Sequence, residues 1–533
     1  MRANLWLFLM ALITLACSPM EKELKESLPD RWPNAVTYEI FVQSFADSDG
    51  DGIGDIKGMT SKLDYLQELG VEAVWLMPIN PSPSYHKYDV SDYYGIHSDY
   101  GTMEDFQEFL EEAHQRHIKV IMDLVINHCS RLHPWFLNAL KEDGEYRDYF
   151  VWADKAGIEA EGNLLKAKTG DSDNIHQWNE VSGQDELYFS FFWSGMPDLN
   201  YDNPKLREEI YEIGNFWLTK IGVDGFRLDA AKHIYPDHRA ADNHAFWKEF
   251  KTKMETYKPE VYLVGEVWAD LPTQAPFAQG FSALFNFDLA FSIMETVKNG
   301  QIVSATIHEH AWKVLDEGSP VTLFNESEKA FKQYNPDFIN TTFLTNHDQN
   351  RVMSFFENHE KKAKLAASIL LTLPGAPYIY YGEEIGMRGL KPDELIREPF
   401  LWEAKNDSMR TQWMEPTYNT TDVVPPLSVQ KKDSGSIFNH YKSLIHFRRK
   451  SSVMTYGGVE QVDLANDELL AFTRSHAGDT VLVVHNLSSR VKRIRQLEPY
   501  SLILFTTSKK VRQTADVLAL PPYQTIILSK PQK

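Results

Sequence analysis

The sequence predicts an α/β protein built on a (β/α)8 TIM barrel, with an inserted lobe after the third strand and a C-terminal antiparallel β-sandwich domain. Three observations support this fold class. Eight short apolar runs recur along the chain, several end in a charged residue or a histidine, and helical patterns separate several of them. Apolar runs without alternation indicate strands that are buried on both faces, and strands that alternate with helices close into a parallel barrel.

The predicted barrel strands are short, and recognisable helices lie between them. The clearest helix starts after Asn203, a good N-cap residue, and has Pro204 at its first position. Apolar residues then recur at helical spacing from Leu206 to Trp217, and Gly222 marks the end. The eight strands are expected at 35–42, 73–78 and 119–128, and from about Gly225, Val261, Ala283, Ile339 and Pro377 onward.

Two intervals depart from the repeating pattern of strand and helix. Residues 130–196 are too many for an ordinary loop and are rich in Asp, Asn, Gly and aromatic residues, which indicates an inserted lobe. After residue 449, short apolar runs joined by turns indicate an antiparallel β domain. The predicted organisation is a signal peptide (1–16), a tether (17–30), a catalytic barrel (31–129 and 197–449), an inserted domain B (130–196) and a C-terminal β domain (450–533).

The N-terminal residues have the pattern of an export signal. Arg2 precedes an apolar stretch of twelve residues, 5–16, whereas a membrane-spanning helix needs ~20. The stretch stops at Cys17, and this ending resembles a bacterial lipoprotein signal in which Cys17 carries the lipid. We therefore expect an exported lipoprotein anchored to the cell envelope only through this lipid, with plain secretion as the alternative. If Cys17 is lipidated, Cys129 has no partner, so no disulfide is expected.

The composition indicates how many domains the chain can form and which kinds of partner it can bind. The chain has 533 residues, of which 43% are hydrophobic, enough for a large core and more than one domain. Its formal net charge of −21 repels phosphate backbones, so nucleic acid is not an expected partner. Aromatic residues make up 13% of the chain, a content that suits both stacking on sugar rings and an ordinary large core. Oligomeric state does not follow from the sequence.

Three carboxylates lie at the ends of predicted strands. Asp229, Glu266 and Asp348 follow different buried runs, and the carboxyl ends of barrel strands meet at one mouth. Cleavage of a glycosidic bond needs a protonated acid and a second carboxylate. Apolar neighbours such as Trp268 are expected to raise the pKa of Glu266, and Arg227 is expected to keep Asp229 ionised. An ion pair at a barrel rim is the alternative, which three such strand ends make improbable.

An acidic loop follows the first predicted strand. Carboxylates at alternate positions and intervening glycines suit Ca²⁺, with a backbone carbonyl completing the ligand set. The alternative is an acidic turn held by side-chain to backbone hydrogen bonds, without a metal. Mutual repulsion of the carboxylates favours calcium, so the predicted cofactor is Ca²⁺ with the ligands Asp47, Asp49, Asp51, Ile53 and Asp55.

Several separated motifs carry a resemblance to a known family. In order along the chain, segments 123–128 (DLVINH), 225–233 (GFRLDAAKH), 265–268 (GEVW) and 343–348 (FLTNHD) resemble the strand-end motifs of glycoside hydrolase family 13, the α-amylase family. Two further segments, 196–200 (MPDLN) and 396–400 (IREPF), are similar to those of the α-amylases intermediate between the oligo-1,6-glucosidase and neopullulanase groups.

The resemblance implies a role for each site residue. Asp229 is the implied nucleophile, Glu266 the acid/base, and Asp348 the carboxylate that holds the sugar hydroxyls and favours the distorted ring. The implied substrate-binding residues are Tyr88, His128, Arg227, Lys232, His233 and His347.

The resemblance also implies an activity, that of an endo-acting α-amylase that hydrolyses α-1,4-glucosidic bonds of starch and maltooligosaccharides with retention. Ala230 after the nucleophile favours this bond, because α-1,6-specific relatives usually carry Val there. A transglycosylase is the enzymatic alternative, since hydrolysis and transfer share the covalent intermediate. A non-catalytic glucan-binding member is the other alternative, and the three retained carboxylates argue against it.

Overall fold

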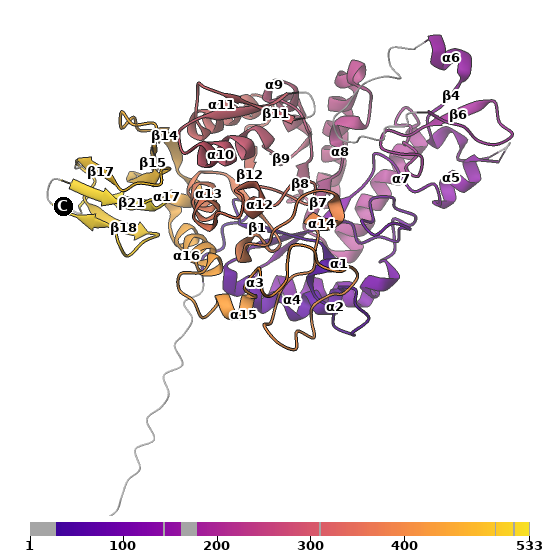
Figure 1. Ribbon diagram of the computed structural model, residues 1–533. Helices are drawn as coiled ribbons and strands as arrows, with labels where there is room; N and C mark the ends of the chain where they lie inside the picture. The colour runs from indigo at the N-terminus through magenta and orange to yellow at the C-terminus, as the bar shows by residue number, and fades with distance from the viewer. Residues whose placement is uncertain are drawn as a thin grey trace, which may run out of the picture.

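The computed structural model in Figure 1 describes residues 28–141, 144–160, 178–308, 311–495, 497–514 and 517–531. Its centre is a closed barrel of eight strands, in which every neighbouring pair is parallel. The strands follow one another in sequence order, so the predicted barrel is confirmed. They are β1 (Thr37–Ile40), β2 (Ala73–Leu76), β3 (Lys119–Leu124), β7 (Gly225–Leu228), β8 (Tyr262–Gly265), β9 (Ala283–Phe285), β12 (Ile339–Thr342) and β13 (Ala376–Tyr380).

Helices cover the outside of the barrel. The helix predicted after Asn203 is α7 (Pro204–Asn215), and the Asn203 side chain accepts a hydrogen bond from the N–H of Lys205. It continues as a π-helical turn, 216–221, and ends at Gly222, whose φ of 101° favours glycine. The longer helices besides α7 are α4 (Met103–Gln115), α8 (Ala240–Tyr257), α10 (Phe287–Asn299), α11 (Pro320–Lys332), α13 (Glu360–Thr372) and α16 (Ile437–Lys450).

The third strand is shorter than predicted. The apolar run 119–128 suggested one continuous strand, but β3 ends at Leu124. The next four residues stay buried although they have left the barrel sheet, because they pair with the segment that returns from the inserted lobe. His128 forms an isolated antiparallel bridge with Asp198, and the carbonyl of Asn127 accepts the N–H of Leu199. The apolar residues of this segment are buried, but residues 125–128 do not pair within the barrel. The predicted third strand was therefore too long at its carboxyl end.

The inserted lobe and the C-terminal domain lie at opposite ends of the molecule (Figure 1). The lobe contains α5 (Pro134–Ala139) and a small antiparallel sheet of β4 (Trp152–Asp154), β6 (Glu186–Phe189) and β5 (Trp178–Asn179). Its residues 161–177 lie outside the described part of the chain, as do the predicted signal peptide, most of the tether and Cys17. Among the described helices, none has both the length and the apolar character that a membrane span requires.

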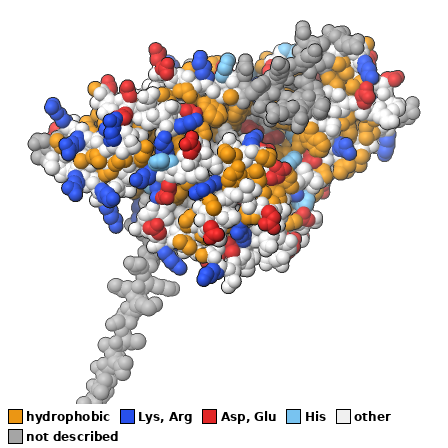
Figure 2. Space-filling model, in the orientation of Figure 1, with side chains coloured by type: hydrophobic (Ala, Val, Ile, Leu, Met, Phe, Trp, Pro, Cys, Tyr) orange, Lys and Arg blue, Asp and Glu red, His pale blue; other side chains and the backbone are white. Residues whose placement is uncertain are grey.

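The C-terminal domain is antiparallel, as predicted, and consists of two sheets. Side chains from both sheets, among them Val484 and Ile494, form a core between them. Figure 2 shows Lys and Arg side chains among hydrophobic ones at this end of the molecule. One sheet has β14 (Gly458–Gln461), β15 (Leu469–His476), β16 (Asp479–Asn486), β21 (Thr525–Ser529) and β18 (Leu502–Thr506), and the other has β17 (Lys492–Arg495), β20 (Val517–Leu520) and β19 (Arg512–Gln513).

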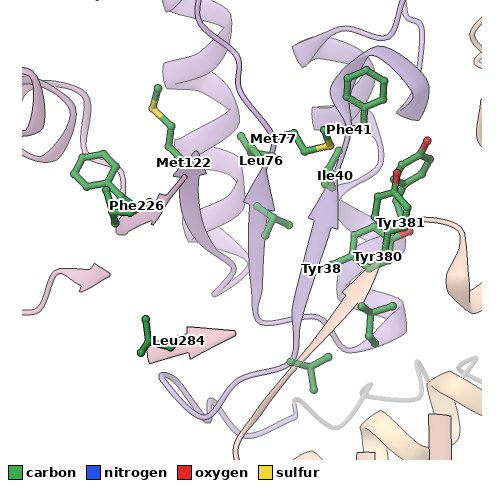
Figure 3. Close-up of a cluster of buried hydrophobic side chains, with 14 of the residues drawn as sticks. Tyr38, Ile40, Phe41, Leu76, Met77, Met122, Phe226, Leu284, Tyr380 and Tyr381 are labelled. Carbon is green, nitrogen blue, oxygen red and sulfur yellow. The ribbon is translucent and has the colours of Figure 1, made fainter. Parts of the chain in front are cut away.

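The hydrophobic core lies on both sides of the barrel wall. Successive residues of a strand point to opposite faces, so Trp75 joins the cluster inside the barrel and Leu76 joins the larger cluster that includes helix residues. Figure 3 shows part of the larger cluster, with Ile40, Leu76 and Met122 projecting from neighbouring strands. The strand ends that carry the candidate site are therefore fixed by packing on both faces.

Candidate active site

The structure brings the three strand-end carboxylates together in one cleft of about 650 Å³. Asp229 directly follows β7 and Glu266 directly follows β8. These strands pair in register with Leu228 beside Gly265, so the next residue of each strand reaches the mouth at the same level. Asp348 comes from the loop after β12 and lines the same cleft.

Arg227 joins two of these carboxylates through its guanidinium group. Its Nη1 lies 2.6 Å from Asp229 Oδ1, and its Nη2 lies 2.5 Å from Glu266 Oε2. Nη1 also donates to both carboxylate oxygens of Asp123 in β3, at 3.0 Å each. The Arg227 side chain is only 1% exposed. A buried charge of this kind needs nearby opposite charge, and the fork of the guanidinium fixes the direction of each carboxylate that it binds.

Glu266 is held in its protonated form at neutral pH. Burial raises the pKa of its carboxyl to about 8, and the neighbouring charges of Asp229 and Asp348 act in the same direction. The Arg227 guanidinium opposes this shift without reversing it. The expected desolvation of Glu266 is therefore confirmed, and the group can supply a proton to a leaving oxygen. The contact between Glu266 and Arg227 was not expected, because Arg227 was assigned to Asp229 alone.

Asp348 has the opposite electrostatic environment. Burial alone would raise its pKa, but His347 and Arg397 hold the pKa well below the usual range of a carboxyl. Arg397 Nη2 lies 2.8 Å from Asp348 Oδ1, and His347 Nε2 lies 3.1 Å from Oδ2. Burial opposes a charge on His347, yet Asp348 and Glu39 raise its pKa to about 10, and its Nδ1 lies 2.5 Å from Glu39 Oε1. Asp348 is therefore an anion beside the protonated Glu266.

Two of the predicted substrate-binding residues lie behind the cleft wall. Arg227 and His347 each have a side chain that is 1% exposed, and they contact the carboxylates rather than the open cleft. Tyr88 lines the cleft in front of them and stacks on the ring of His347, with the centroids 5.5 Å apart. The Tyr88 hydroxyl lies 2.7 Å from His347 Nε2, so the histidine fixes the position of the tyrosine ring.

The remaining predicted substrate-binding residues line the side of the cleft nearest the inserted lobe. They are His128, Lys232 and His233. The ring of His233 stacks on Phe191 with the centroids 3.9 Å apart, and Lys232 Nζ lies 3.5 Å from Asp237 Oδ1. The structure therefore places these three side chains where a bound chain would pass between the barrel and the lobe.

Three residues of the site were not singled out from the sequence. Arg397 binds Asp348, Glu39 binds His347, and Asp123 binds Arg227. All three are buried and charged. Glu39 and Asp123 interrupt otherwise apolar predicted strands, which is the signal that could have identified them. Arg397 belongs to the segment 396–400, but the sequence does not reveal that this segment reaches the carboxylates.

The acidic loop between α1 (Val42–Phe45) and α2 (Ile56–Ser61) gathers only part of the predicted calcium ligand set. Carboxylate oxygens of Asp47, Asp49 and Asp55 lie within 4.8 Å of one another, and hard oxygen donors at this spacing fit Ca²⁺. Asp51 does not belong to this group, and its Oδ1 instead accepts the N–H of Ile53 at 2.7 Å. The hydrogen bonds of the alternative interpretation are also present, since Asp47 Oδ1 accepts the N–H of Gly50 at 2.7 Å.

Comparison with known proteins adds independent information. Residues 39–457 match the family described as alpha amylase, catalytic domain, and residues 469–527 match the alpha-amylase SusG C-terminal domain. Over 507 residues the chain is 42% identical to Alpha-amylase 3 of Dictyoglomus thermophilum, with 94% of each chain covered. It is 35% identical to a 4-alpha-glucanotransferase of Thermotoga neapolitana, over 87% of this chain and 99% of that protein. The crystal structure of alpha-amylase from H. orenii superposes with a TM-score of 0.81 at 41% identity, covering 93% of this chain and 99% of that one.

Proposed function

The chain belongs to the α-amylase family of glycoside hydrolases that act on α-glucans, and we propose that within it the chain is an endo-acting α-amylase. The proposed reaction is hydrolysis of α-1,4-glucosidic bonds in starch and maltooligosaccharides, with retention of the anomeric configuration. The observation that carries the proposal is the shared guanidinium of Arg227, which places Asp229 and the protonated Glu266 side by side. Retaining glycosidases have their two carboxyl groups ~5–5.5 Å apart, and two carboxylates on one guanidinium are compatible with that spacing.

In the proposed mechanism, Glu266 gives its proton to the glycosidic oxygen while a carboxylate oxygen of Asp229 forms a bond to the anomeric carbon. The leaving chain departs with the proton. A water molecule then attacks the anomeric carbon, Glu266 takes the proton of the water, and the bond to Asp229 breaks. Asp348 accepts hydrogen bonds from sugar hydroxyls, and Tyr88 stacks on the sugar ring. Lys232 and His233 contact the leaving part of the chain.

The shape of the cleft supports cleavage within a glucan chain. Trp193 of the inserted lobe lines one side of it, and Trp312 and Phe355 line another. Aromatic faces of this kind stack on sugar rings. Cleft walls that extend past the carboxylates can hold sugar units on both sides of the bond that is cut, as endo action requires.

Transfer to a second sugar is the other candidate function. The ring of Trp312, from the strand β11 (Ala311–Leu315), stacks on Phe291 with the centroids 4.2 Å apart, and both line the cleft. A sugar bound there would compete with water for the covalent intermediate. The similarity to a protein named 4-alpha-glucanotransferase supports this second candidate.

Calcium and export are further parts of the proposal. Ca²⁺ bound by Asp47, Asp49 and Asp55 would neutralise the acidic loop and stabilise it, with no part in the chemical steps. Export with a lipid on Cys17 rests on the sequence pattern alone. Under this proposal the enzyme meets its glucan outside the cytoplasm.

Product analysis tests the proposed function. Amylose, pullulan and cyclodextrins are digested separately, and the anomer of the first products is followed by proton NMR before mutarotation. We expect α-anomeric products, internal cuts in amylose and little cleavage of the α-1,6 bonds in pullulan. Release of β-anomers would contradict retention, and products longer than the starting oligosaccharide would favour transfer.

A further inference from the structure

Arg397, which holds Asp348 in the cleft, has a second carboxylate within reach. Its Nη2 lies 2.8 Å from Asp348 Oδ1 and 3.2 Å from Asp393 Oδ2. The two carboxylates therefore compete for the same nitrogen, and a small shift of the arginine strengthens one contact at the expense of the other. The position of the Arg397 backbone thus decides how firmly Asp348 is held.

Side chains from other parts of the barrel hold that backbone in place. Arg397 directly follows the short helix α14 (Asp393–Ile396), and the next residues, 397–426, belong to no helix or strand. The carbonyls of residues 396, 397 and 398 nevertheless all accept side-chain hydrogen bonds, so this segment has a defined position without regular structure. The donors, at 2.5–3.2 Å, are Arg351 and Tyr380 for residue 396, Ser44 for residue 397 and Tyr381 for residue 398.

Arg351 is the donor whose burial costs the most. The residue is 1% exposed, and its Nε and Nη1 donate to the carbonyls of Ile396 and Tyr381 at 2.8 Å and 2.7 Å. The guanidinium also lies over the rings of Tyr380 and Tyr381, 4.4 Å and 4.7 Å from their centroids, at the end of β13 (Figure 3). Buried charges are usually paired with an opposite charge, whereas these hydrogen bonds go to backbone carbonyls. Such a residue indicates a specific role.

Arg351 connects two loops of the site. It follows Asp348 by three residues, so its bond to Ile396 joins the loop that carries Asp348 to the segment that carries Arg397. The same loop contacts Arg397 twice more, through the carbonyl of His347, which accepts Arg397 Nε at 2.9 Å, and through Asp348 itself. Those two contacts depend on the Arg397 side chain. The Arg351 contact is the one of the three that acts on the backbone of the segment.

Glu398 holds the segment on the other side of Arg397. Its carboxylate is buried and forms hydrogen bonds through both oxygens, since Oε1 accepts the N–H of Thr417 at 2.6 Å and Oε2 accepts that of Asn419 at 2.8 Å. The Asn419 side-chain amide donates to Oε2 as well, at 2.9 Å. Because both oxygens accept, an amide in place of this carboxylate would set a donor against a donor. Glu398 thereby ties the segment to residues 417–419.

We propose that Arg351 and Glu398 are positioning residues, which fix the backbone on both sides of Arg397 and so keep its guanidinium on Asp348 rather than on Asp393. Neither residue lines the cleft, so each acts on the reaction through Arg397. The proposal rests on the proposed function, in which Asp348 favours the distorted sugar ring. An interaction that is made mainly in the transition state affects kcat, so loss of either residue should lower kcat and leave KM nearly unchanged.

A double-mutant cycle tests whether these residues act through Arg397. Turnover of a maltooligosaccharide is measured for the wild-type chain, for Arg397→Gln, and for Arg351→Gln and Glu398→Gln in each of these two backgrounds. In the wild-type background we expect each change to lower kcat on the order of 10-fold, with KM within about twofold, because a displacement of ~1 Å weakens catalysis by up to ~100-fold. In the Arg397→Gln background the same changes should lower kcat by less than about twofold.

Two further variants separate positioning from loss of stability. Asp393→Asn removes the competing carboxylate, so the effect of Arg351→Gln on kcat should be about threefold smaller in that background. Arg448 is a matched control at the amino-terminal end of β13, because it is buried and its guanidinium donates to the carbonyls of Leu373 and Gly375 at 2.7 Å and 2.5 Å. Arg448→Gln should lower the melting temperature, as Arg351→Gln does, but should leave kcat within about twofold.

Three results would overturn the proposal. Equal factors in the wild-type and Arg397→Gln backgrounds would show that the two residues act independently of Arg397. A fall in kcat for Arg448→Gln as large as that for Arg351→Gln would show a general effect of a lost buried arginine. If Arg351→Gln does not fold, the Glu398→Gln cycle decides alone, and an unchanged kcat in that variant is the third such result. Hydrolysis by the wild-type protein is established first, since its absence would refute the proposed function, whereas equal factors in an active enzyme refute the positioning role alone.

Discussion

Replacement of Asp229, the proposed nucleophile, should change the pKa of Glu266, the proposed acid/base. Asp229 and Glu266 contact the same guanidinium, at 2.6 Å and 2.5 Å, and the Asp229 charge is one of the causes that raise the pKa of Glu266 to about 8. Asp229→Asn keeps the size and shape of the side chain and removes its charge. The variant therefore mimics, in charge alone, the covalent intermediate in which Asp229 is esterified.

The size of the effect follows from Coulomb's law. Two charges ~5 Å apart interact by about 3 kcal/mol at an effective dielectric constant of ~20, which is equivalent to ~2 pKa units. The pKa of Glu266 should consequently fall from about 8 to roughly 6 in Asp229→Asn. Turnover should fall on the order of 10⁴-fold or more, because Asp229 is the proposed nucleophile and an amide cannot replace it in that role. Binding of a maltooligosaccharide should persist.

Infrared difference spectroscopy of the carboxyl band measures this titration. The spectrum of Asp229→Asn is compared, as a function of pH, with that of the double variant Asp229→Asn/Glu266→Gln, so that only Glu266 remains in the difference. The wild-type protein is treated in the same way with Glu266→Gln. Titration of Glu266 at the same pH in both backgrounds would falsify the coupling, and residual hydrolysis near the wild-type rate would refute the nucleophile assignment.

Three further predictions concern other parts of the chain. A calcium chelator should lower the melting temperature, and Asp49→Asn should reduce that shift; no shift in the wild-type protein would count against the metal site. Burial raises the pKa of Glu383 to about 8, above ~4.3 in the unfolded chain, so its contribution to stability is complete below about pH 4 and is lost as the pH rises through about 8. Glu383→Gln should therefore reduce the loss of melting temperature between about pH 6 and about pH 9, and an unchanged loss would contradict this assignment. Arg397→Gln should lower kcat/KM by on the order of 100-fold, because Asp348 would lose a charged partner at 2.8 Å; an unaltered kcat/KM would exclude this positioning role.

The barrel is predictable from the sequence because the burial of each strand is evident from the residue types of that strand alone. Runs such as 73–78 are apolar without alternation, as expected for a strand that is buried on both faces. The same logic fails where a segment is buried without pairing in the barrel. Residues 125–128 are buried by the segment that returns from the inserted lobe, so their apolar character carried the third strand too far.

The sequence identifies the carboxylates of the candidate site but not the side chains that bind them. Asp229 and Glu266 are each identified by a position at the end of a run, which is a property of one strand. The binding of both by Arg227 depends on the pairing of β7 with β8, which brings their ends to the same level. Arg397 reaches its carboxylate from a loop that has no periodic pattern. The acidic loop is similar, because its spacing does not reveal that Asp51 turns towards a backbone N–H.

The position of Arg227 also bears on how one carboxyl can act first as an acid and then as a base. Before the reaction, burial and the charge of Asp229 outweigh the guanidinium, so Glu266 keeps its proton. Once Asp229 is esterified its charge is lost, while Arg227 still lies 2.5 Å from Glu266 Oε2. The balance then favours the anion, which is the form that accepts a proton from the attacking water. A guanidinium that contacted Asp229 alone would lack this second effect, so the bridge between the two carboxyl groups is part of the proposed catalytic cycle.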